Sequence, residues 1–138
     1  MTEQGLVAVD TSVAVPLLTA SHEAHAAVLE WAAGRSLALS GHAVAETYSV
    51  LTRLPGSSRV DASDAVRLID SNFGARLMLT EAQSANAHHA FARLGIEGGA
   101  VYDGLVALAA LSHGATLATR DARARSTYEA LGVGVLLV

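Results

Sequence analysis

The stretch of residues 6–12, LVAVDTS, constrains the fold of this chain more than any other segment. A short unbroken apolar run that ends in polar residues predicts a strand buried on both faces of a parallel sheet. Ligands of open parallel α/β sheets bind beyond the carboxyl ends of the strands. Asp10, which directly follows the run, is therefore placed where such proteins carry their chemistry. The alternative is that Asp10 serves only as the N-cap of the next helix.

The composition narrows the classes of function. With 138 residues, half of them apolar, the chain is expected to form a single domain over residues 1–138. It has no cysteine and no lysine, which excludes thiolate chemistry, a P-loop and a Schiff-base enzyme. The formal net charge of −4 leaves no broad basic surface for duplex nucleic acid, so any such contact must be local, through arginines or a bound cation. No apolar stretch is long enough to span a bilayer, and we expect no membrane association and a cytoplasmic location.

Apolar runs alternate with helix-like periodicity along the whole chain. Strands are predicted at residues 6–9, 37–40, 76–79, 115–119 and 133–138. Helices are predicted at residues 11–19, 22–33, 43–54, from 61 onward, 81–94, 100–111 and 122–131. We expect Ser21, Asp61 and Thr80 to cap the second, fourth and fifth helices, and Val44, Tyr48 and Leu51 to form the core stripe of the third. This alternation predicts an α/β fold whose parallel sheet is covered by helices on both faces.

Four acidic residues occupy comparable places in this scheme. Asp10 and Asp121 follow strands, whereas Glu46 and Asp103 lie early on helices that should pack against the sheet. Each has a structural alternative: Asp121 can cap a helix, Glu46 can be a solvated glutamate, and Asp103 can be a carboxylate with a buried partner. If the first strand lies between the second and the fourth, the four carboxylates can converge on one crevice at the switch point of the sheet.

Such convergence implies a cation. Two like charges about 4 Å apart repel by about 4 kcal/mol at an effective dielectric constant near 20, so four carboxylates would destabilise a small domain. Oxygen ligands without His or Cys favour Mg²⁺ or Mn²⁺ over zinc. An ion of this kind suits phosphodiester hydrolysis, because it can activate water and stabilise the leaving oxygen.

Four segments carry these acids: VDTS at 9–12, AET at 45–47, VYDGLVALAAL around Asp103 and LATRDAR around Asp121. They resemble the corresponding segments of PIN domains, and most closely those of the VapC-type toxins of bacterial toxin–antitoxin pairs. The resemblance extends over essentially the whole chain. It implies a three-layer α/β/α fold with a five-stranded parallel sheet of order 3-2-1-4-5, and a Mg²⁺- or Mn²⁺-dependent endoribonuclease.

The resemblance also implies roles for individual residues. Asp10, Glu46, Asp103 and Asp121 would form the catalytic quartet, with Asp10 and Asp103 as direct metal ligands. Asp121 would bind through water or a second ion, and Glu46 would orient the attacking water. The resemblance places Ser12 and Thr119 near the metal or the scissile phosphate, and Arg120 is a candidate phosphate contact, although a solvated strand-end arginine is the alternative.

The family further implies an RNA substrate, a small cognate antitoxin that blocks the acids, and a homodimer. Two other interpretations stay open at this point. One is a housekeeping RNA-processing or DNA-directed PIN nuclease, and the other is a non-catalytic binding module that kept the fold. The intact quartet argues against the second, because a binding module has no need to crowd four acids together.

Overall fold

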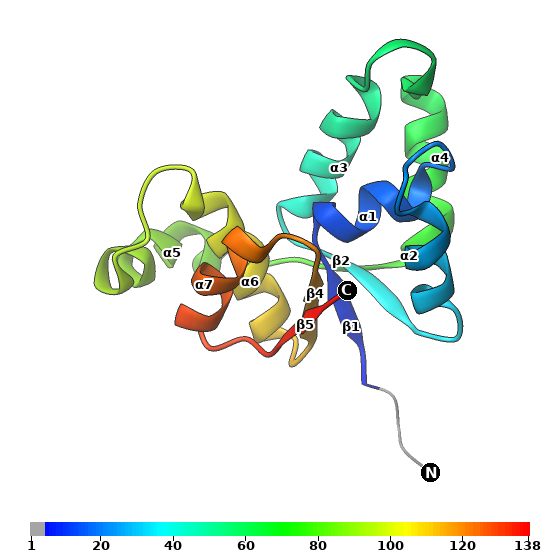
Figure 1. The fold of residues 1–138 in the computed structure, drawn as a ribbon. Coiled ribbons are helices and arrows are strands. Elements are labelled where there is room, and N and C mark those ends of the chain that lie inside the picture. The colour runs from blue at the N-terminus through cyan, green and yellow to red at the C-terminus, as the bar shows by residue number, and fades with distance from the viewer. Residues whose placement is uncertain (1–4) are drawn as a thin grey trace.

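A parallel sheet of five short strands forms the centre of the molecule (Figure 1). The computed structural model describes residues 5–138. The strands are β1 (Val7–Val9), β2 (Leu37–Ser40), β3 (Ala75–Leu77), β4 (Thr116–Thr119) and β5 (Val135–Leu137). The helices are α1 (Thr11–Leu18), α2 (His25–Ala32), α3 (Ala43–Thr52), α4 (Ala62–Asn72), α5 (Glu81–Leu94), α6 (Ala100–Ser112) and α7 (Ala122–Ala130), with a 3-10 turn, η1, at Gly56–Ser58.

The strand order β3-β2-β1-β4-β5 confirms the predicted topology. All four neighbouring pairs are parallel, and Val9 is in register with Leu39 of β2 and Ala118 of β4. The chain leaves β1 toward β2 on one side and returns to β4 on the other, so the connections diverge at β1. This divergence is the switch point at which α/β sheets bind ligands, and Asp10 follows β1 there.

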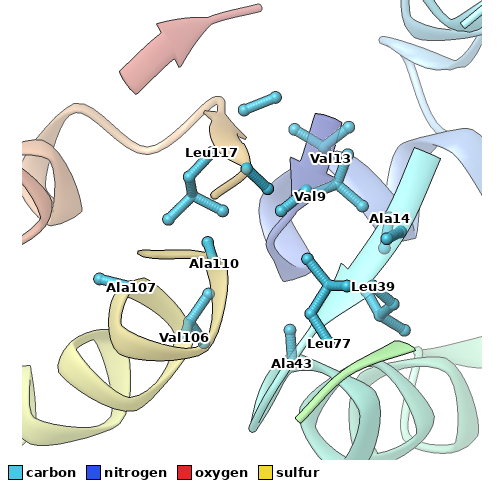
Figure 2. Close-up of a cluster of buried hydrophobic side chains, with 14 of the residues drawn as sticks. Val9, Val13, Ala14, Leu39, Ala43, Leu77, Val106, Ala107, Ala110 and Leu117 are labelled. Carbon is cyan, nitrogen blue, oxygen red and sulfur yellow. The ribbon is translucent and has the colours of Figure 1, made fainter. Parts of the chain in front are cut away.

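Helices cover both faces of the sheet, as the alternation predicted. Helices α1 to α4 gather on one side of the strands and α5 to α7 on the other (Figure 1). Figure 2 shows one part of the core, where Val106, Ala107 and Ala110 of α6 meet the strand residues Val9 and Leu117. These side chains are almost wholly buried. Within the described residues, no helix is both long and apolar enough to cross a membrane.

Helices with clear end signals in the sequence begin and end as predicted. The Thr80 hydroxyl accepts from the backbone of Gln83, and the Gln83 side chain accepts from the backbone of Thr80, which completes a capping box at the start of α5. The same helix ends at Gly95, whose φ of 70° suits glycine. Asp10 and Asp121 cap α1 and α7, each accepting from a backbone N–H two residues further on.

Two predicted caps are absent. Helix α2 begins at His25 rather than at residue 22, because residues 21–24 form turns and the Ser21 hydroxyl bonds to Ser58. The Asp61 side chain accepts no capping bond in α4, where Asp64 pairs with Arg67 instead. An exposed polar residue that could cap a helix can also form hydrogen bonds or ion pairs with other residues. The local sequence alone does not determine which of these partners it takes.

The core face of α3 also differs from the prediction. Ala43, Thr47 and Leu51 are fully buried, whereas Tyr48 is 39% exposed; of the expected stripe, Leu51 is in the core and Val44 is partly buried against it. The two stripes are neighbours on the same helix, and the small side chains of Ala43 and Thr47 allow α3 to approach β2 and α1 closely. The helix also ends at Thr52, two residues earlier than expected.

Two contacts fix helix α6 in place. The fully buried Ser40 hydroxyl, at the end of β2, donates a hydrogen bond of 2.8 Å to the carbonyl of Val106. Gly104 lies against the ring of Phe91 in α5, and a Cβ atom at this position would stand 2.5 Å from a ring carbon. Asp103 is adjacent to this glycine, so both contacts set the position of its carboxylate.

Candidate active site

The structure brings the four predicted acids to one pocket. Asp10, Glu46, Asp103 and Asp121 line a cavity of about 190 Å³ beyond the ends of the central strands. They come from four separate places in the chain: the end of β1, the first turns of α3 and α6, and the loop after β4. The predicted convergence is therefore present. Ser12 lines the same cavity, but Thr119 and Arg120 do not.

Asp10 combines the two interpretations of its position. Its Oδ1 atom accepts from the backbone N–H of Ser12 at 3.0 Å and from the Ser12 hydroxyl at 2.6 Å, so it does cap α1. Its Oδ2 atom accepts from the Tyr128 hydroxyl at 2.7 Å. The side chain is nearly buried and still lines the cavity. Three donors therefore hold this carboxylate in one orientation toward the pocket.

Tyr128 was not predicted as a site residue. It lies on α7, is almost completely buried, and meets Asp10 from 118 positions further along the chain. Burial, and then the nearby negative charge of Asp10, raise the pKa of Tyr128 above its ordinary value. The phenol therefore stays protonated and donates to Asp10. The only hint in the sequence is a large aromatic residue in a helix that is otherwise polar.

The hydroxyls of Ser12 and Thr119 join the ends of β1 and β4. Ser12 donates its single hydrogen to Asp10, because a carboxylate can only accept, so across 3.2 Å Thr119 donates to Ser12. Thr119 accepts from the backbone N–H of Asp121, and Ser12 accepts from that of Arg120. Since Thr119 is fully buried, its position does not support the expected contact with substrate. It supports Asp10 through Ser12 instead.

Arg120 and Arg123 are the basic residues nearest the acids in sequence. The Arg120 side chain is exposed and does not line the cavity. Arg123 approaches Asp121 at 3.7 Å, but its side chain is 95% exposed, and a pair of this kind contributes little. The acidic pocket is thus not neutralised by an arginine of the described chain.

Burial and the nearby acids both disfavour the charged form of Asp103. Burial raises the pKa of its carboxyl to about 6, and the charges of Asp121, Glu46 and Asp10 add to this effect, while Arg123 opposes it. The shift means that the charged form of Asp103 is disfavoured unless a cation is near. Perturbed carboxyls in a polar cleft are typical of catalytic centres.

Comparison with known proteins decides the family. The family model for the PIN domain matches residues 7–130, which include all four acids. The chain belongs to the PIN domain family. Ribonuclease VapC27 of Mycobacterium tuberculosis is 56% identical over 95% of this chain and 96% of its own length.

Solved structures share the PIN fold. FitAB bound to the IR36 DNA fragment aligns with a TM-score of 0.70 at 25% identity, covering 95% of this chain and 94% of the matched chain. VapC20 of M. tuberculosis, described as a sarcin-ricin loop cleaving toxin, aligns with a TM-score of 0.66 at 18% identity over 94% and 96% of the two chains. The second likeness concerns the fold alone.

The donor set of this PIN domain fits a hard divalent cation. The four carboxylates offer only oxygen atoms to the cavity, and the buried hydroxyl of Thr11, which also lines it, has no hydrogen-bond partner among residues 5–138. Across the same residues, no three His, Asp or Glu side chains stand in an arrangement that could by itself hold a metal ion. The expected trio of Asp10, Asp103 and Asp121 is thus not a preformed cage. Mg²⁺ does not require one, because proteins usually bind it through one or two carboxylates, waters and substrate phosphates.

Proposed function

We propose that this PIN domain, acting as one unit over residues 1–138, is a Mg²⁺- or Mn²⁺-dependent endoribonuclease and the toxin of a toxin–antitoxin pair. The observation that carries the proposal is the single pocket shared by Asp10, Glu46, Asp103 and Asp121, where burial, and then the charges of the other three acids, raise the pKa of Asp103 to about 6. The 56% identity to a ribonuclease supports RNA as the substrate.

In this proposal Asp10 and Asp103 would hold the metal ion directly, and Asp121 would hold it through water or would bind a second ion. A bound divalent ion would offset the negative charge of the pocket and of the phosphate, and would lower the barrier to attack by water. Glu46 orients the attacking water and takes its proton. The water oxygen bonds to phosphorus as the P–O bond to the leaving oxygen breaks, and the leaving oxygen takes up a proton from solvent.

The other site residues position these groups. Tyr128 and Ser12 fix the Asp10 carboxylate, and Thr119 holds Ser12. Arg120, exposed beside this network, is assigned to the substrate phosphate. With no lysine in the chain, arginine is the only side chain that can bring a permanent positive charge to the RNA.

The test is cleavage of structured RNAs by the purified chain in Mg²⁺ or Mn²⁺, repeated in EDTA. We expect cleavage that EDTA abolishes and that Asp103→Asn lowers by at least about 100-fold, as expected when a group that stabilises the transition state is removed. Asp61→Asn makes the same chemical change at an exposed acid outside the pocket and should cleave normally. Cleavage that survives in EDTA, or in Asp103→Asn, would contradict the proposal.

We further propose a small antitoxin as partner and a homodimer as the assembly. Support comes from the FitAB complex and from a hollow of about 660 Å³ between α3 and α4, bordered by the exposed apolar side chains of Tyr48, Val66 and Met78. Expression should arrest growth for the wild type and not for Asp103→Asn. A housekeeping nuclease would cleave RNA without arresting growth.

A further inference from the structure

A second hollow opens directly beside the acidic pocket. Its volume is about 460 Å³, and it shares Glu46 and Asp103 with that pocket. The outer face of α3 and the start of α6 form its walls, and His42, Tyr102 and Arg53 line it. Whatever enters this hollow therefore lies next to the group that reacts at the acids.

Two aromatic rings stack in this hollow. The rings of His42 and Tyr102 have centroids 5.0 Å apart and an interplanar angle of 26°. Tyr102 is nonetheless 54% exposed, although its neighbours Val101 and Asp103 are partly buried. His42 thus covers one side of the tyrosine ring, and much of the remaining surface is open. A half-open aromatic platform is the kind of surface on which unpaired nucleic-acid bases stack.

The charge along the hollow also suits a nucleotide. Glu46 and Arg53 are seven residues apart on α3, which places them about 10 Å apart along the helix axis. The Arg53 side chain is exposed and forms no ion pair with a carboxylate of residues 5–138. Along α3, Glu46 lies between His42 and Arg53, so the hollow has the aromatic pair at one end and, at the other, an exposed cation that can meet a phosphate.

We propose that this hollow binds an unpaired nucleotide next to the scissile phosphate of RNA, with its base stacked on Tyr102 and His42, while a phosphate farther along the strand meets Arg53. The inference rests on the proposed ribonuclease activity and extends it to the substrate. It requires single-stranded RNA at the cleavage site, because a base in a duplex is not free to stack on a side chain.

The test is the binding of a mixed-sequence single-stranded RNA, with 2-aminopurine in place of adenine, to Asp10→Asn protein in Mg²⁺. Asp10 is assigned to the metal ion, so this change should stop cleavage. Asp10 does not line the hollow, so the hollow stays intact. Fluorescence should be quenched on binding. Adding Tyr102→Ala should weaken binding at least about 5-fold and reduce the quenching, since stacking on an aromatic ring contributes about 1–3 kcal/mol per base.

Two control variants make the result specific. Tyr102→Phe keeps the ring and should bind within about 2-fold of the parent. Leu29→Ala removes an exposed apolar side chain of α2 that lines neither this hollow nor the one proposed for the partner, and should have no effect. In the active chain, Tyr102→Ala should raise KM at least about 5-fold and change kcat less, because stacking holds the substrate before and during the reaction.

Unchanged binding and quenching in Tyr102→Ala would overturn the inference. So would an equal loss in Leu29→Ala, a changed oligomeric state with unchanged RNA affinity, or equal Tyr102-dependent binding of DNA of the same sequence. RNA cleavage with a normal KM in Tyr102→Ala would contradict the proposed stacking site and still support the proposed ribonuclease activity. Tyr102-dependent quenching by a wild-type chain that cleaves no RNA would contradict the proposed ribonuclease activity and still support the stacking site.

Discussion

At the scale of single residues, Asp10 shows how one side chain serves the fold and the site together. The same carboxylate caps α1 through Oδ1 and accepts from Tyr128 through Oδ2 while lining the acidic pocket. The structural and functional interpretations of this residue are therefore not alternatives. The cap gives the carboxylate the fixed orientation that a binding group needs.

Removing the Tyr128 hydroxyl should loosen this orientation. Tyr128→Phe keeps the ring in the core but leaves Asp10 Oδ2 without its donor, so we expect the free energy of unfolding to fall by about 1–3 kcal/mol. Affinity for Mn²⁺ should fall at least about 10-fold, a common effect of losing a group that orients a metal ligand. Calorimetric Mn²⁺ titration checks this, with the exposed Tyr48→Phe as control. Unchanged Mn²⁺ affinity would show that Tyr128 only fills space.

The raised pKa of Asp103 should make the free energy of unfolding of the metal-free protein depend on pH. Its folded pKa of about 6 exceeds the ordinary 3.8, so between these values the folded state holds a proton that the unfolded chain releases. The free energy of unfolding should therefore decrease as pH rises from about 4 to about 6. Asp103→Asn cannot titrate and should be the more stable protein at neutral pH.

Urea titrations of the wild type and of Asp103→Asn, both in EDTA, measure the difference at each pH. The two proteins should be alike near pH 4 and should diverge as pH rises through about 6, with the variant the more stable. A difference that is independent of pH would show that folding does not disfavour the charged form of Asp103.

At the scale of helices and strands, the sequence predicted best where an element carries its own end signals. Thr80, Gln83 and Gly95 define α5 within its own residues, and the structure has the predicted bounds. The start of α2 and the buried face of α3 were predicted wrongly, because both depend on neighbouring elements. Ala43 and Thr47 face the core through packing that hydrophobicity alone does not reveal.

The site residues, too, could be predicted where their position depends on local sequence and not where it depends on distant partners. The four acids could be found because each follows a strand or opens a helix, positions that topology brings to one edge of a sheet. Tyr128 and Ser40 could not be found, since their contacts with Asp10 and Val106 join segments far apart in the chain. No local pattern encodes such partners.

The packing of α5 on α6 gives a prediction at this scale. Gly104→Ala would place a methyl group 2.5 Å from a ring carbon of the buried Phe91, so the helices must separate or the ring must shift. Such overpacking costs about 1–3 kcal/mol, partly offset by about 1 kcal/mol from the better helix propensity of alanine. We expect a lower melting temperature, restored in part by adding Phe91→Leu. A stabilised Gly104→Ala protein would show that the contact relaxes freely.

At the scale of the whole molecule, an acidic chain without lysine has assembled its carboxylates from both sides of the sheet at one switch point. Helix α3 brings Glu46 from one face and α6 brings Asp103 from the other, so the pocket exists only when both layers are packed (Figure 1). A cation that binds the folded pocket and not the unfolded chain must then stabilise the entire domain.

The central claim is that these carboxylates bind a divalent ion together, and thermal unfolding with increasing Mn²⁺ tests it most directly. A concentration 100 times the dissociation constant stabilises the folded state by about 2.7 kcal/mol, which should raise the melting temperature by several degrees. Asp61→Asn should respond as the wild type does, while Asp103→Asn should be more stable without Mn²⁺ and respond weakly to it. A melting temperature that rises equally in the wild type and Asp103→Asn, or in neither, would contradict the account.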